Sequence, residues 1–305
     1  MSAVGAEFQV NTYTDSDQRY PSVTSLSDGG WVVTWTSTGQ DGSRHGIYGQ
    51  RYGSDGQAVG AEFQVNTYTE SSQSYPSVTS LSDGGWVVTW QSNGQDGYGG
   101  GIYGQRYDAN GETVWGEVQV DTYTSSYQEY PSVTSLSDGG WVVTWSSYTQ
   151  DGSSWGIYGQ RYNADGQRVR VPGHSRVEGV RVNTYTNDDQ QYPSVTSLTD
   201  GGWVVTWMSN GQDGSSYGIY GQRYDANSQA VGTEFQVNTY TNSYQNYPSV
   251  TSLSDGGWVV TWESWFQDGS YFGIYGQRYG SDGEAVGTEF RVNMSYSPSV
   301  GQDLA

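Results

Sequence analysis

The sequence contains no cysteine and no lysine, and it has only two histidines among its 305 residues. The absence of cysteine excludes disulfides and thiolate metal sites. With 12 basic and 32 acidic residues, the formal net charge is −20, so the chain lacks the clustered cations that bind nucleic acid or anionic lipid. No apolar run approaches membrane-spanning length. We therefore expect no nucleic-acid partner and no membrane insertion.

The N-terminal residues 1–8 lack the charged and apolar regions of a secretory signal peptide. They enter a repeat almost at once. This start suggests an excised segment of a larger protein or an engineered one.

Glycine, tyrosine and tryptophan are abundant instead, with 44, 27 and 13 copies, which is typical of many short strands joined by tight turns. The chain also repeats itself with a period of 55 residues, lengthened to 62 in the fourth unit. The units cover residues 5–59, 60–114, 115–169, 170–231 and 232–286, and a partial sixth unit covers 287–305.

Each unit contains four extended runs separated by Gly, Asp, Asn and Pro turn signals. In the first unit these runs are residues 20–26, 31–35, 46–52 and 59–65, the last of which crosses the unit boundary. The short glycine turns between them favour an antiparallel meander. We expect four strands per unit.

A single four-stranded sheet with two partly apolar faces cannot bury both, so the units must stack face to face. Radial closure achieves this and leaves only short edges. We predict an all-β, five-bladed β-propeller of five four-stranded antiparallel blades, forming one domain over residues 1–305. An open β-solenoid is the disfavoured alternative, because its parallel strands are not joined by two-residue hairpins.

Fourth-strand segments occur at both ends of the array, at residues 6–10 and 287–292. Only one of them can complete a closed ring. The other is redundant, belongs to a following domain, or forms a spare edge strand for self-association.

The motif DGGWVVTW, followed by QDGSxxGIYGQRYDANG and EFQVNTYT, resembles a tandem repeat of very large bacterial extracellular proteins, often found beside hemolysin-type calcium-binding repeats. The resemblance covers nearly the whole chain. It implies secretion, an adhesin-like setting and a link to calcium, and it supplies no catalytic residues. In fold alone, the chain is also similar to five-bladed lectin propellers of the tachylectin kind. The regular spacing is broken by an insert at residues 170–179, which the period assigns to the fourth unit.

The copies differ mainly in two windows, residues 15–19 and 36–45 with their equivalents. Alternate connections of a meander emerge at the same end of the sheet, so both windows lie on one face of the propeller. Exposed loops tolerate substitution, which is one explanation for this variation. Contact with a ligand is the other, because large aromatic and imidazole side chains gather there. They include His45, Tyr98, Tyr148, Trp155, Tyr217, Trp265, Tyr271 and Phe272.

Aromatic rings beside Asp, Asn, Gln and Ser make amphipathic surfaces that suit sugars and protein loops. Five such sites in a ring would bind a repetitive target with avidity. The competing structural role for these rings is to cover the clefts between blades.

One aspartate lies in a QDG triplet of each copy on the same face. Carboxylates of this kind are candidate Ca²⁺ ligands. The triplets are not the DxDxDG of an EF-hand, and an aspartate that caps its own turn is the commoner explanation. No cofactor is required by the sequence. The candidate residues are Asp41, Asp96, Asp151, Asp213 and Asp268.

Each copy also carries one arginine in GQRY, as Arg51 does in the first copy. A sialidase-like site would gather arginines and a tyrosine nucleophile at one asymmetric centre. Five equivalent arginines instead suggest ion pairs with blade carboxylates or packing along neighbouring rings. The two histidines are too few for a metal or nucleophilic site. We therefore predict that the chain is not an enzyme.

The sequence favours a secreted, multivalent, carbohydrate-binding propeller, lectin- or adhesin-like, that binds a glycan or cell-surface ligand through its variable aromatic loops. The alternative is a structural or protein-interaction module of a large extracellular protein.

Overall fold

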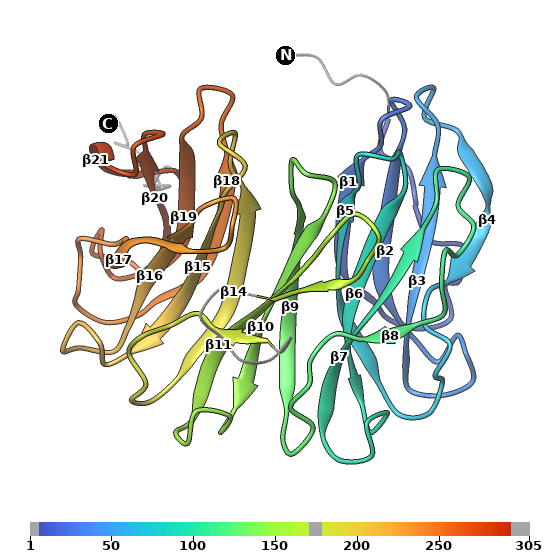
Figure 1. Cartoon of the computed structure of the whole chain (residues 1–305), viewed down its shortest axis with the longest axis horizontal. Coiled ribbons are helices and arrows are strands. Elements are labelled where there is room, and N and C mark those ends of the chain that lie inside the picture. Colours follow the sequence, from blue (N-terminus) through green and yellow to red (C-terminus); the bar gives the residue numbers. More distant parts are fainter. Residues whose placement is uncertain (1–5, 171–178, 294–305) are drawn as a thin grey trace, which may run out of the picture.

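The computed structural model describes residues 6–170 and 179–293. In this part of the chain, all regular structure is β-strand, arranged as five antiparallel sheets that follow chain order (Figure 1). The prediction of a five-bladed β-propeller is confirmed. No helix among the described residues is long and apolar enough to cross a membrane.

The first two blades contain eight strands. Blade 1 consists of β1 (Gln18–Ser25), β2 (Trp31–Thr38), β3 (His45–Tyr52) and β4 (Ala58–Gln64). Blade 2 consists of β5 (Gln73–Ser80), β6 (Trp86–Asn93), β7 (Gly100–Tyr107) and β8 (Val118–Gln119).

The later blades repeat this order. Blade 3 consists of β9 (Gln128–Ser135), β10 (Trp141–Tyr148), β11 (Trp155–Tyr162), β12 (Arg168–Val169) and β13 (Val180–Arg181). Blade 4 consists of β14 (Gln190–Ser197), β15 (Trp203–Asn210), β16 (Tyr217–Tyr224) and β17 (Ala230–Gln236). Blade 5 consists of β18 (Gln245–Ser252), β19 (Trp258–Trp265), β20 (Phe272–Tyr279) and β21 (Ala285–Arg291).

The insert lies in the outer strand of blade 3, because β12 and β13 both pair with β11. The fourth sequence unit, to which the insert belongs, therefore begins within the outer strand of blade 3. The reason is that each outer strand crosses the boundary between two sequence units. Residues 171–178 of the insert lie outside the described residues.

The first hairpin of each blade depends on its SDGG or TDGG turn. In blade 1, the backbone N–H of Gly30 donates to Oδ1 of Asp28 at 2.8 Å. A Cβ on Gly30 would meet the carbonyl oxygen of Tyr52 at 2.3 Å, so only glycine allows the outer hairpin to lie this close. The sequence interpretation of Asp28 and its equivalents as turn residues agrees with this geometry.

Four hydrophobic cores hold neighbouring blades together. Between blades 1 and 2, Val32 and Ile47 pack against Val78, Val88 and Trp90. Equivalent clusters lie between blades 2 and 3, 3 and 4, and 4 and 5. Hydrophobic burial is thus the main stabilising contribution at each junction.

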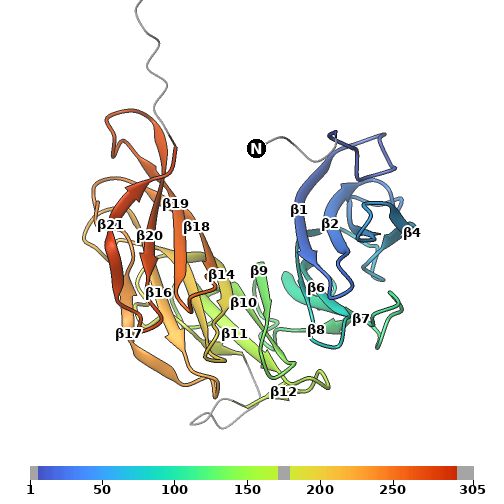
Figure 2. The same ribbon diagram turned by 90° about the horizontal axis from the view of Figure 1, so that it is seen from above.

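Backbone N–H groups fix the alignment of these junctions. The N–H of Val78 donates to Oγ of Ser22 at 3.1 Å, and that of Ser80 donates to Oγ1 of Thr24 at 3.2 Å. The inner strands β1, β5, β9, β14 and β18 consequently stand side by side along the inside of an arc (Figure 2).

The described residues form no hydrophobic core between blades 5 and 1. Val23 of blade 1 is 63% exposed, whereas its four equivalents are each 7% exposed. The Arg278 side chain is 42% exposed, against 11–16% for its equivalents in blades 1 to 4, because no following blade covers it. The radial arrangement therefore has one open junction, visible in Figure 2.

Residues 6–10 lie where the outer strand of a preceding blade would lie. The Phe8 ring packs edge-on against Tyr52 at 5.5 Å, as Phe63 packs against Tyr107 at the next junction. The outer strand of blade 5 is β21. Of the two spare segments, β21 completes a sheet and residues 6–10 pack against Tyr52 on the free face of blade 1, leaving Val23 exposed.

Candidate functional site

A row of five tyrosines lines the inside of the arc. Each belongs to a Tyr-Pro-Ser triplet near the start of an inner strand, and the triplets together border a groove of about 410 Å³. The tyrosines are Tyr20, Tyr75, Tyr130, Tyr192 and Tyr247. They lie at the same end of the blades as the variable loops. The reason is that the start of β1 pairs with the end of β2, and the β2–β3 loop emerges from that end.

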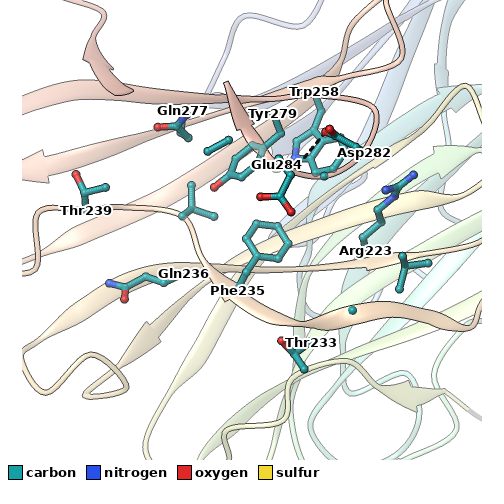
Figure 3. Close-up of a pocket in the computed structure, with 15 residues that line it drawn as sticks. Arg223, Thr233, Phe235, Gln236, Thr239, Trp258, Gln277, Tyr279, Asp282 and Glu284 are labelled. Carbon is teal, nitrogen blue, oxygen red and sulfur yellow. Dashed lines mark hydrogen bonds between the residues drawn. The ribbon is translucent and has the colours of Figure 1, made fainter. Parts of the chain in front are cut away.

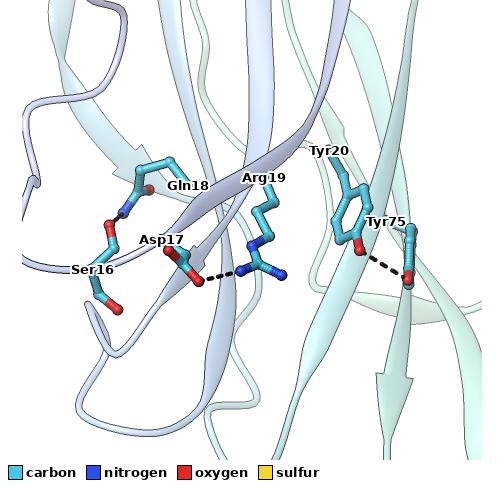
Figure 4. A network of polar contacts seen from close by, with 6 residues as sticks. All are labelled: Ser16, Asp17, Gln18, Arg19, Tyr20 and Tyr75. Carbon is cyan, nitrogen blue, oxygen red and sulfur yellow. Dashed lines mark hydrogen bonds and ion pairs between the residues drawn. The ribbon is translucent and has the colours of Figure 1, made fainter.

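Neighbouring rings of this tyrosine row are in contact. Their centroids are separated by 4.2, 5.0, 4.2 and 4.8 Å in chain order. The Tyr75 hydroxyl donates to the Tyr20 hydroxyl at 3.3 Å, a contact seen in Figure 4. Tyr192 donates to Tyr130 in the same way at 3.2 Å. The row thus presents flat ring surface and hydroxyl groups together.

The backbone of every tyrosine in the row is left-handed, with φ between 52° and 56°. For a bulky residue this conformation costs about 1–2 kcal/mol. The proline that follows disfavours the right-handed helical region. A register shift beside each tyrosine, between Arg19 and Ser22 in blade 1, shows a bulge that turns the side chain out of the ladder. Such strain, repeated in every blade, is typical of a functional site.

Side chains of the preceding blade hold three of these bulges. The N–H groups of Tyr75, Tyr130 and Tyr192 donate to Oγ1 of Thr36, Oε1 of Gln91 and Oγ of Ser146, at 3.2–3.3 Å. The residue at this position in blade 4 is Met208, which carries no such oxygen. The five positions are therefore alike in backbone and unlike in their neighbours.

Burial is the main cause that raises the pKa of Tyr75 and of Tyr130, and the hydrogen bond to a second tyrosine adds to it. Both hydroxyls are neutral near pH 7. Burial also raises the pKa of Glu129, the residue before Tyr130. Its equivalents are Arg19, Ser74, Gln191 and Asn246, so the surroundings of the row differ from blade to blade. Arg19 forms an exposed ion pair with Asp17 (Figure 4).

The predicted loop residues divide into exposed and packed ones. Tyr98 and Tyr271 are 72% exposed, and Phe272 and Tyr148 are also exposed. Trp265 lies 4.5 Å from Phe272 and 5.8 Å from Tyr271, measured between ring centroids, so blade 5 carries an aromatic cluster.

Three other predicted residues lie in partly buried positions. Trp155 packs on Tyr148 at 5.1 Å. Tyr217 packs against the core of blades 4 and 5, and its hydroxyl donates to Asp189 at 3.4 Å. His45 lies between blades 1 and 2, with Nδ1 3.4 Å from Oγ of Ser74. For Tyr217 and His45, the structural role of covering a cleft fits the contacts.

The QDG aspartates cap their own turns. Oδ1 of Asp41 accepts the N–H of Ser43 at 2.9 Å, and its equivalents accept in the same way. Oδ2 of Asp41, Asp96, Asp151 and Asp213 is buried without a hydrogen-bond partner. Among the described residues, no group of three or more His, Asp or Glu side chains could hold a metal ion. Calcium binding stays a prediction from the sequence.

The GQRY arginines pair with carboxylates of their own blades, as expected. Nη2 of Arg51 lies 2.7 Å from Oδ2 of Asp28, and the other four blades contain the same pair. These arginines lie on β3 and its equivalents, not on the inner strands. They do not gather around the tyrosine row.

Sequence reasoning missed the tyrosine row. It searched for differences between copies, whereas Tyr-Pro-Ser is the same in all five. The available signal was a bulky residue before proline inside an extended run, since this pattern favours a bulge or turn.

Comparisons with known proteins give structural matches only. No family model and no curated sequence matches the chain. A protein of unknown function from Dyadobacter fermentans has a TM-score of 0.60 at 10% identity, covering 90% of this chain and 83% of that one. The NanB sialidase from Streptococcus pneumoniae has a TM-score of 0.60 at 8% identity, covering 91% and 61%. A thermostable family-43 glycoside hydrolase has a TM-score of 0.52 at 11% identity, covering 96% and 99%.

These matches support the propeller fold, and the resemblance to hemolysin-type repeats and tachylectins stays a prediction. They contradict the prediction that the chain is not an enzyme, because the proteins that share its fold include a sialidase and a glycoside hydrolase. The prediction of no enzyme activity rested on the equivalence of the five sequence copies. Glu129 and its unlike equivalents show that blades with one backbone can place different groups around a shared centre.

Proposed function

We propose that the chain binds carbohydrate along the tyrosine row, with the exposed aromatic loops of the same face extending the contact. The single observation that carries this proposal is the row itself: five strained tyrosines border one groove. Aromatic faces stack on the C–H surfaces of sugars, and neutral hydroxyls orient the sugar hydroxyls. The glycoside-processing proteins among the structural matches agree with this ligand class.

The repetition of the row favours an extended ligand with repeated units. Each blade contributes one ring and one hydroxyl, so weak contacts add along the groove. A lectin- or adhesin-like role outside the cell, directed at a glycan or cell-surface ligand, belongs to this proposal. Self-association through a spare strand is a separate prediction, which light scattering over a concentration series tests.

Glycan-array screening followed by titration calorimetry tests the proposal. The test variant carries Tyr75→Asn and Tyr130→Asn, because asparagine tolerates left-handed φ, so the change removes the rings and their hydroxyls without straining the backbone. We expect at least a tenfold loss of affinity. A Tyr98→Ala variant, altered in an exposed loop, is the control and should lose less. Full binding by the double variant with a native thermal melt would overturn the proposal.

Glycoside cleavage is a second candidate function. Glu129 favours it, since this partly buried carboxyl, whose pKa is raised by burial, directly precedes Tyr130 of the row, and a carboxyl group is the general acid of glycoside cleavage. A panel of chromogenic glycosides tests it. Turnover by the wild type that Glu129→Gln abolishes, with glycan binding kept, is the expected result. Turnover unaffected by Glu129→Gln would refute the role of this residue.

A further inference from the structure

A groove opens at the perimeter between blades 4 and 5. It has a volume of about 460 Å³ and is bordered by β17 on one side and by β20 and the turn before β21 on the other (Figure 3). Phe235, Trp258 and Tyr279 supply its aromatic walls, and Arg223, Asp282 and Glu284 supply its charges. It lies on the outer strands, away from the tyrosine row.

The matching junction between blades 2 and 3 is filled by Trp115. The ring centroid of Trp115 is 5.0 Å from the Arg106 guanidinium carbon, and Trp141 lies on that guanidinium at 5.6 Å. A Cβ on Gly166 would meet the Trp115 ring at 2.0 Å, so the indole lies directly against that turn. Only about 40 Å³ remains open there.

The two junctions share their arginine, tryptophan and tyrosine walls, whereas Phe235 stands in place of Val118 and Glu284 in place of Gln167. Arg223 lies over Trp258 at 5.7 Å, as Arg106 lies over Trp141. Gly283 borders the groove as Gly166 borders Trp115. The position of Trp115 itself is taken by Gly232, which has no side chain. One face of the Arg223 guanidinium therefore lacks the ring that Arg106 has.

We propose that this groove binds an aromatic side chain of another polypeptide, with an exposed tryptophan as the best fit. The indole of Trp115 shows that the arginine, tryptophan and glycine walls common to both junctions accept a large aromatic ring. A ring in the groove completes the sandwich around Arg223 and gains a cation–π contact. Asp282 and Glu284 repel anionic aromatics such as nucleotides, and they favour an indole whose N–H is a donor.

Side-chain NMR of the arginines tests the proposal at this one site. Arg223 and Arg106 each have a buried Nε without a hydrogen-bond partner. Their Nε–H signals are assigned through Arg223→Lys and Arg106→Lys variants. The probe is N-acetyl-L-tryptophanamide, and N-acetyl-L-leucinamide is the apolar control without a ring. We expect a saturable upfield shift of the Arg223 signal towards that of Arg106 with the tryptophan probe alone.

Two variants sharpen the test. Val231 lines the groove, is 42% exposed and lacks the left-handed backbone of the neighbouring Gly232 (φ 70°), so Val231→Trp fills the groove without the strain that a side chain on Gly232 would impose. It should abolish the probe-induced shift. Trp115→Gly opens the junction of blades 2 and 3, and its Arg106 signal should move downfield and return when the probe is added.

An Arg223 signal that does not move, or that moves equally with the leucine probe, would overturn the proposal. An Arg106 signal in Trp115→Gly that ignores the probe would do the same. Glycan binding in Val231→Trp should equal that of the wild type, because the tyrosine row is unaltered. A failure of the carbohydrate proposal is thereby distinguished from a failure of this one.

Discussion

Asp121 leaves Oε1 of Gln128 without a hydrogen-bond donor. At the equivalent position, three other junctions carry an asparagine whose Nδ2 donates to the matching glutamine Oε1. These pairs are Asn66–Gln73 at 3.2 Å, Asn183–Gln190 at 3.1 Å and Asn238–Gln245 at 3.3 Å. Asp121 accepts the N–H of Ile102 at 2.5 Å and is 2% exposed. Its burial raises the pKa to about 7.

Asp121→Asn should therefore stabilise the protein near pH 8. It supplies the missing donor and removes a buried charge, which together correspond to about 1–4 kcal/mol. Because the folded pKa lies above the unfolded one, the folded wild type binds more protons between about pH 4 and 7. Its stability should thus fall as pH rises through this window, relative to the variant. Urea melts at pH 5 and pH 8 measure both effects, and an equal gain at the two pH values would contradict the assignment.

The open junction predicts unequal costs for one substitution in two blades. Val78→Ala removes methyl groups from a buried core and should cost about 2 kcal/mol, whereas Val23→Ala at a 63% exposed position should cost under about 0.5 kcal/mol. Chemical denaturation of both variants checks this. Equal costs would mean that blades 5 and 1 pack together in solution.

The repeat period and turn chemistry were sufficient to predict the blades, because each hairpin is specified locally by residues such as Asp28 and Gly30. The open junction could not be predicted. It depends on the angle between successive blades, which four packed cores determine together. The tyrosine row was missed because left-handed φ at Tyr75 arises from the bulge and its proline, not from strand propensity.

Backbone strain in the row is measurable by comparing Tyr75→Gly with Tyr75→Ala. Both variants lose the ring, but only glycine adopts a φ of 56° without cost. We expect the glycine variant to be the more stable by about 1 kcal/mol. Thermal melts at one protein concentration suffice for this comparison. An alanine variant as stable as the glycine variant would show that the bulge relaxes once the ring is removed.

Arg291 pairs with Oδ2 of Asp268 at 2.5 Å, whereas Oδ2 of Asp41 has no partner. The residue that corresponds to Arg291 in blade 1 is Gln64, since Gln64 pairs with Tyr48 as Arg291 pairs with Tyr275. Gln64→Arg should therefore add an ion pair worth about 0.5–1 kcal/mol, weaker at high salt.

Melts of Gln64→Arg, Asp41→Asn and the double variant isolate this pair as a coupling energy. The same set tests the calcium prediction. An ion on Oδ2 of Asp41 would compete with the new guanidinium, so stabilisation by Ca²⁺ relative to chelator should shrink in Gln64→Arg. A calcium response that is the same in the wild type, Gln64→Arg and Asp41→Asn would show that calcium does not bind at Asp41.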